Sequence, residues 1–158
     1  AIIAHLTDQV LERVRAGGLP WRPGARELLQ ELRRADIPTA LVTMSIRRLA
    51  TAVAEAIDFD AFTVIVAGDE VEHAKPHPAA YLRAAELLGV NPADCVAIED
   101  SGPGVAAAEA SGAATIGVPL IVPLPETRAV TIWPTLAGRS VADLSAGLAG
   151  ARGARNPA

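Results

Sequence analysis

The chain has 158 residues, of which 51% are hydrophobic, 20% charged and 3% aromatic, and its net charge is −4. This length suits one sizeable hydrophobic core and excludes two large domains. The acidic balance, with no basic run longer than two arginines, argues against nucleic acid as a partner.

The N-terminal part of the chain is predicted to form two helices joined by a stiff connector. Residues 1–16 carry apolar side chains at helical spacing, and the glycine pair at 17 and 18 ends this helix. The proline-rich sequence of residues 19–24 predicts the main boundary in the chain. A second helix is expected over residues 25–35.

From residue 39 onward, short apolar strands alternate with amphipathic helices. Strands are predicted over residues 39–43, 62–66, 95–98, 114–118 and 130–133, and helices over 46–57, 78–88, 105–111 and 141–148. This alternation predicts an α/β fold, a Rossmann-like parallel sheet with helices on both faces. Ligands of such sheets bind beyond the carboxyl ends of the strands.

The first of these strands ends in Thr43-Met44-Ser45, directly before a helix. Hydroxyl groups there, together with the free N–H groups of a helix start, can bind an anion. The simpler explanation is that Ser45 caps the helix, which serine does often. Taken alone, this segment favours the cap.

Lys75 is the only lysine among 14 basic residues, and it lies directly before Pro76 in a segment that the prolines stiffen. A compact ammonium group suits a phosphate or a carboxylate as a point charge. The alternative is a solvated loop lysine, and the strong arginine bias of the chain favours the functional interpretation.

Glu99 and Asp100 follow directly after the strand at residues 95–98. Two adjacent carboxylates repel each other, and a hard cation such as Mg²⁺ is a natural partner for their oxygens. Small residues at positions 101–104 allow the backbone to come close. The alternative is a loop acid beside a helix-capping acid. With Thr43 and Lys75 at other strand ends, the pair predicts a site for phosphoryl transfer.

These segments resemble the haloacid dehalogenase superfamily and, within it, the β-phosphoglucomutase-like branch. The matching stretches are residues 40–45, 68–71, 75–78 and 96–105, in the family's order. The resemblance implies that Thr43 and Lys75 are catalytic, that Thr43, Met44, Ser45 and Lys75 bind phosphate, and that Asp100 and Glu99 bind Mg²⁺. It also implies a helical cap ending in residues 1–19, a hinge at 20–24, a core over 25–150 and a disordered tail at 151–158.

The family's first motif, an Asp-x-Asp after the first core strand, has no counterpart in the sequence. Asp58-Phe59-Asp60 has the spacing, but it precedes a predicted strand instead of following one. By the resemblance, the nucleophile is expected outside this chain, on a central strand between the strands that end at Thr43 and Ile98. Without it, two interior edges are unpaired or pair directly. The chain is then expected to be a piece of a longer protein, or unstable or inactive alone.

The favoured hypothesis is a Mg²⁺-dependent phosphohydrolase of small phosphorylated metabolites, such as sugar phosphates, that acts through an aspartyl-phosphate. The alternatives are a phosphomutase, a catalytically inactive remnant and a phosphate-binding module like a response-regulator receiver, although the motif order here differs from that of receivers. The single cysteine, Cys95, excludes an internal disulfide and predicts a buried structural thiol in a reducing cytoplasm. No membrane partner is expected, because prolines interrupt the longest apolar run.

Overall fold

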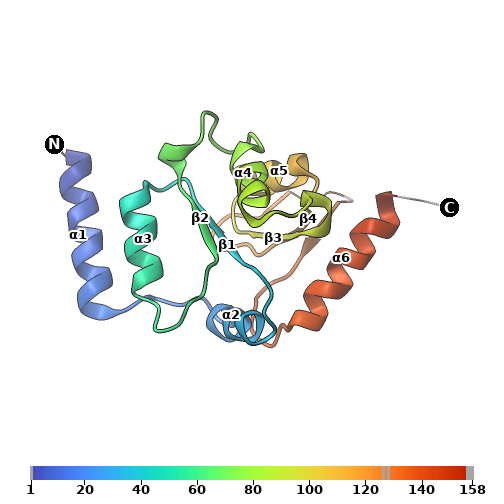
Figure 1. Ribbon diagram of the computed structural model, residues 1–158, viewed down its shortest axis with the longest axis horizontal. Helices are drawn as coiled ribbons and strands as arrows, with labels where there is room; N and C mark the ends of the chain where they lie inside the picture. Colours follow the sequence, from blue (N-terminus) through green and yellow to red (C-terminus); the bar gives the residue numbers. More distant parts are fainter. Residues whose placement is uncertain (1, 126, 128, 156–158) are drawn as a thin grey trace.

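The computed structural model describes residues 2–125, 127 and 129–155, and it has the predicted α/β fold. Strands and helices alternate from residue 40 onward, as the sequence indicates (Figure 1). The helices are α1 (Ile2–Gly17), α2 (Ala25–Arg34), α3 (Arg47–Glu55), α4 (Ala79–Leu88), α5 (Gly102–Ser111) and α6 (Val141–Arg155), with 3-10 turns η1 (Gly68–Glu70) and η2 (Pro92–Asp94). The strands are β1 (Ala40–Val42), β2 (Val64–Val66), β3 (Val96–Glu99), β4 (Ala114–Gly117) and β5 (Val130–Ile132).

The strands form two parallel sheets. One sheet pairs β1 with β2, and the other has the order β3-β4-β5. Among the described strands, β1 pairs only with β2 and β3 only with β4, so each has an edge without a strand partner. Of the two outcomes expected if a strand between them is lacking, the structure therefore has the open edges and not direct pairing of β1 with β3. In the view of Figure 1, β1 and β2 stand between α3 and the strands β3 and β4.

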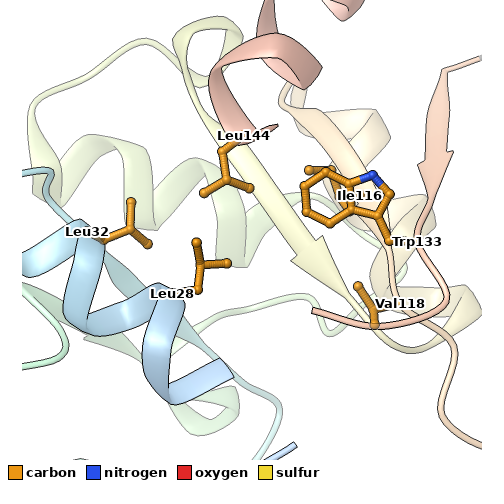
Figure 2. Packing of buried hydrophobic residues seen from close by; sticks show 6 residues of the cluster. All are labelled: Leu28, Leu32, Ile116, Val118, Trp133 and Leu144. Atoms are coloured by element: carbon orange, nitrogen blue, oxygen red, sulfur yellow. The ribbon is translucent and has the colours of Figure 1, made fainter. Parts of the chain in front are cut away.

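Helices α2 and α6 cover one face of the three-stranded sheet. Figure 2 shows Leu28 of α2 and Leu144 of α6 beside Trp133 and the β4 residue Ile116. Leu28, Leu144 and Trp133 are each at most 7% exposed. Burial of these side chains is the main source of stability in this part of the chain.

Small side chains bring α4 and α5 close to their strands. On α4, Ala80 and Ala84 pack against Val66 of β2, while Ala108 of α5 packs against Ala97 of β3. These contacts explain how a chain with so few aromatic residues fills its core: alanine faces let helix and sheet backbones approach closely. Helix α5 thus lies on the face opposite to α2 and α6.

The connector before α2 is anchored to the end of β4. The Arg22 guanidinium donates hydrogen bonds to the carbonyls of Val118 and Pro119, both at 3.0 Å. Gly24 has a φ of 83°, and a side chain there would collide with the Leu136 carbonyl. Only glycine fits this position without strain.

Helix α1 packs along α3. Leu11 is 1% exposed, and the Arg48 guanidinium lies 2.9 Å from the Asp8 carboxylate. This ion pair is largely exposed and adds little stability, so apolar contact holds the two helices together.

Two helices are longer than the sequence predicts, and α3, at Arg47–Glu55, is shorter than the predicted range 46–57. Helix α5 begins at Gly102 instead of residue 105, because Ser101 accepts a hydrogen bond from Gly104 N at 3.2 Å and Pro103 suits a first turn. Helix α6 continues through Arg155, so positions 151–155 of the predicted disordered tail are helical, and residues 156–158 lie outside the described part. No helix among the described residues is long and apolar enough to span a membrane.

Replacing Leu28 with alanine should lower the free energy of unfolding by about 2–5 kcal/mol, because a cavity would open between α2, β4 and α6. Urea denaturation followed by circular dichroism measures the change. Leu87→Ala is the matched control, since Leu87 is 45% exposed on α4, and it should change stability by no more than about 0.5 kcal/mol. Equal effects of the two substitutions would contradict the assignment of Leu28 to the core.

Candidate functional site

Lys75 links the carboxyl ends of β1 and β3. Its ammonium group donates a hydrogen bond to the Val42 carbonyl at 3.2 Å and forms an ion pair with Glu99 Oε1. Both side chains are buried, with 9% of Lys75 and 7% of Glu99 exposed. The structure thus brings together two of the predicted site residues at the place where ligands of parallel sheets bind.

The Glu99 carboxylate has a second donor in Tyr81 of α4. The Tyr81 hydroxyl donates to Glu99 Oε1 and lies 3.4 Å from Lys75 Nζ, which also stands 4.9 Å from the centre of the tyrosine ring. Burial, followed by the negative charges of Glu99 and Asp100, raises the pKa of Tyr81 above its ordinary value. The phenol is therefore a hydrogen-bond donor at neutral pH.

Helix α5 comes very close to Glu99. A side chain at Gly104 would collide with the Glu99 carboxylate, whereas one at Gly102 would meet no atom within 4 Å. The small residues after the acid pair thus serve as the sequence predicts, by letting the helix backbone approach. Asp100, the next residue, is exposed to solvent.

The loop after β1 holds Thr43, Met44 and Ser45 beside the Lys75 segment. Thr43 N donates to the Val66 carbonyl at 3.0 Å, and the Thr43 hydroxyl accepts from Ser45 N at 3.1 Å, so its own hydrogen is free to be donated onward. The backbone N–H of Lys75 donates a hydrogen bond to Met44 Sδ at 3.4 Å. A side chain at Gly68 would collide with the Met44 backbone, so this glycine is required for the loop to take its course.

Ser45 does not cap α3 as the simpler interpretation expects. The N-cap position is Ile46, which makes no side-chain capping bond. Asp69 of η1 provides the cap instead, by accepting a hydrogen bond from Arg47 N at 2.9 Å. The Ser45 hydroxyl is thus not engaged in holding the helix start.

The Arg47 guanidinium is occupied by η1. It donates to both oxygens of Glu70, at 2.8 and 2.6 Å, and to the Ile65 carbonyl at 2.8 Å. A hydrogen bond from Ala67 N and the contact with Arg47 lower the pKa of Glu70. Arg47 is thus held at η1, whereas Lys75 contacts the ends of β1 and β3.

Tyr81 is the site residue that sequence reasoning missed. It is the only tyrosine in the chain, and it follows the only lysine by six positions in an alanine-rich helix. A single tyrosine so close to the single lysine was the sequence signal that could have identified it as a site residue. Cys95, predicted to be a buried thiol, is only partly buried: its thiol donates to the Asn91 carbonyl at 3.4 Å, and this partial burial raises its pKa.

Open hollows occur away from these residues. One, of about 270 Å³, lies where β1 and β2 begin and is lined by Arg33, Asp36 and Asp60, among others. Another, of about 380 Å³, lies beside Gly24 and Arg139. Neither hollow is lined by Thr43, Lys75, Glu99 or Asp100. Among the described residues, no three His, Cys, Asp or Glu side chains are grouped to hold a metal ion.

Comparison with known proteins gives consistent matches. Residues 3–112 match the haloacid dehalogenase-like hydrolases. Protein CbbY (plasmid) of Cupriavidus necator is 39% identical over 123 residues, which are 75% of this chain and 48% of CbbY. Hexitol phosphatase A of Escherichia coli is 38% identical over 108 residues, which are 68% of this chain and 50% of that protein. The chain thus spans about half the length of these curated relatives.

A solved structure extends this likeness to the fold. CbbY from Rhodobacter sphaeroides, in complex with xylulose-(1,5)bisphosphate, aligns with 87% of this chain and 64% of its own length. The TM-score is 0.79 and the sequence identity is 30%. The fold is therefore shared with a protein whose structure holds xylulose-(1,5)bisphosphate.

Replacing Gly104 with alanine should displace the Glu99 carboxylate and lower the free energy of unfolding by about 1–3 kcal/mol, because neither helix nor strand can retreat easily. Gly102→Ala is the matched control in the same helix and should stay within about 0.5 kcal/mol of the unmodified chain. Thermal melting of both variants measures the difference. If the Gly104 variant is as stable as the control, α5 does not lie as close to Glu99 as the structure has it.

Proposed function

This chain belongs to the haloacid dehalogenase-like hydrolases, and we propose that it carries the phosphate-binding and magnesium-binding side of a phosphatase for small phosphorylated sugars. The observation that carries the proposal is the buried ammonium group of Lys75 at the ends of β1 and β3. The named activities of relatives such as hexitol phosphatase A agree with this substrate class.

We propose that the phosphate binds beside Lys75 and the loop of Thr43, Met44 and Ser45. The Thr43 hydroxyl retains a hydrogen to donate, and the Ser45 hydroxyl is not used in capping. A phosphate there would meet one ammonium charge and several uncharged donors, which is the usual way to hold a phosphoryl group. Lys75 would act as a point charge, and its ion pair with Glu99 would fix the position of that charge.

Asp100 and Glu99 would hold Mg²⁺, and the chemistry of these residues fits that ion in part. Asp100 presents an exposed carboxylate, a hard oxygen donor, at the end of β3. Glu99 already has Lys75 and Tyr81 on one oxygen, so we assign Asp100 as the principal ligand and Glu99 as an assistant, directly or through water. When bound, Mg²⁺ supplies charge that compensates the phosphoryl oxygens.

The nucleophile in this proposal is an aspartate outside the 158 residues. In the sequence, no Asp-x-Asp follows a strand, and β1 and β3 each have an unpaired edge. A strand that pairs with both edges would end beside Lys75. Its first aspartate would attack phosphorus while the second gives a proton to the departing sugar oxygen. The second aspartate would then take a proton from water, which releases phosphate from the aspartyl-phosphate. Lys75 and Thr43 would contact the phosphoryl oxygens throughout.

The remaining expectations concern the surroundings of the site. We propose that residues 1–19 are the end of a helical cap, that residues 20–24 connect it to a core over 25–150, and that the protein acts in the cytoplasm. A cap would exclude water and choose the substrate. A phosphomutase would use the same half-site, and it would return an isomerised sugar phosphate instead of free phosphate.

The proposal can be tested with a chimera that joins this chain to the part of Cupriavidus necator CbbY that has no counterpart in it. The chimera should release inorganic phosphate from xylulose-1,5-bisphosphate or a hexitol phosphate in the presence of Mg²⁺. Lys75→Met should lower kcat by roughly 100-fold or more, as expected when a charge that stabilises the transition state is removed. Arg83→Met, which removes an exposed cation from α4, is the matched control and should be neutral.

Two outcomes would refute the proposal. One is a folded chimera that releases no phosphate from any of these substrates. The other is Mg²⁺-dependent phosphate release by the 158-residue chain alone, together with a cooperative melt, since an external nucleophile would then be unnecessary. An isomerised sugar phosphate as the product would support the phosphomutase instead.

A further inference from the structure

Tyr81 is the contact between α4 and the ion pair of Lys75 and Glu99. Its hydroxyl donates to the same Glu99 oxygen that pairs with the Lys75 ammonium group. The hydroxyl oxygen also lies 3.4 Å from Lys75 Nζ, within reach as an acceptor. The three groups therefore form a closed triangle in which each touches the other two.

The triangle limits where Glu99 can point. A buried phenol hydroxyl needs an acceptor, and a buried carboxylate needs donors, so each group makes the other's position favourable. The backbone of α5 at Gly104 bounds the carboxylate on another side, so the Tyr81 hydroxyl and the Lys75 ammonium group together fix the direction of Oε1. A phenylalanine at position 81 would fill nearly the same volume, but among the described residues it would leave Lys75 as the one side-chain donor to Glu99 Oε1.

Lys75 depends on Glu99 in turn. Its ammonium group has the Val42 carbonyl, the Glu99 carboxylate and the Tyr81 hydroxyl around it, and it lies 4.9 Å from the centre of the Tyr81 ring. If the carboxylate turned away, the ammonium group would lose its strongest partner and would seek solvent. The position of Lys75 at the end of β1 is thus tied to the hydroxyl on α4.

We propose that Tyr81 is a positioning residue whose hydroxyl holds Glu99 against Lys75 and thereby aims the ammonium group at the end of β1. Only the catalytic consequence of this positioning, contact of the ammonium group with a phosphate, rests on the proposed function. The positioning itself is a property of the chain without substrate, metal or a nucleophile.

The chain offers a clean measurement because Lys75 is its only lysine. Protein labelled with ¹⁵N-lysine gives one side-chain ammonium signal in NMR, and the exchange of its protons with water reports how firmly it is hydrogen-bonded. Tyr81→Phe should speed this exchange by roughly fivefold or more, in line with the loss of a hydrogen bond to a charged group. Leu82→Ala is the matched control, since Leu82 is the neighbouring residue of α4 and is 44% exposed, and it should leave the exchange rate unchanged.

A double-mutant cycle separates positioning from a general loosening of the fold. Glu99→Gln should speed the exchange on its own, and Tyr81→Phe should add little in that background because its effect acts through the carboxylate. Circular dichroism verifies that every variant is folded. A general structural effect would instead appear equally with and without Glu99.

Three results would overturn the proposal: exchange in Tyr81→Phe as slow as in the unmodified chain, an undiminished effect in the Glu99→Gln background, or no protected lysine signal in the unmodified chain. Because no substrate takes part, these results are independent of the chimera assay. An inactive chimera with a Tyr81-dependent lysine signal would refute the phosphatase and leave the positioning intact.

Discussion

The buried ion pair between Lys75 and Glu99 is the interaction on which this structure depends. No strand hydrogen bonds join the two sheets in the described part of the chain, so this pair, with the Val42 carbonyl, is the polar link between the ends of β1 and β3. Loss of either partner would leave a buried charge without compensation, at a cost of about 3–5 kcal/mol. The link that joins the sheets is therefore also the group that would meet a phosphate.

Helices α5 and α4 enclose this pair, and in each helix one residue makes the contact possible. Helix α5 can lie against Glu99 because position 104 is glycine, and α4 reaches the same carboxylate through Tyr81. The alanine-rich faces of both helices allow this approach. A site in which charges are few and their positions are fixed suits the proposed contact with phosphoryl oxygens, because positioning and charge compensation lower the cost of the charge that develops there.

The sequence predicted most of the fold, because alternating apolar strands and amphipathic helices carry periodic signals that burial requires. That Lys75 and Glu99 lie at one edge followed from the rule that parallel strands end at one edge of a sheet, whereas their ion pair was not predicted, because Glu99 was assigned to Mg²⁺ and Lys75 to phosphate. Tyr81 could not be found in this way, because its role depends on one side-chain direction between α4 and β3. Asp69 was missed for a similar reason: it caps α3 from a turn far along the chain, and local pattern favoured Ser45. The length of α6 depends on helix propagation, which carries no sharp end signal here.

The anchoring of Arg22 to the end of β4 has a mechanical consequence for α1. With its guanidinium on the carbonyls of Val118 and Pro119, and with Gly24 against Leu136, the connector behaves as part of the rigid body that contains the sheets. A pivot would then lie before it, at Gly18, which has a φ of 73° and open space around it. Turning α1 about Gly18 would leave the connector in place, but it would have to break the apolar contact between α1 and α3 in which Leu11 is buried.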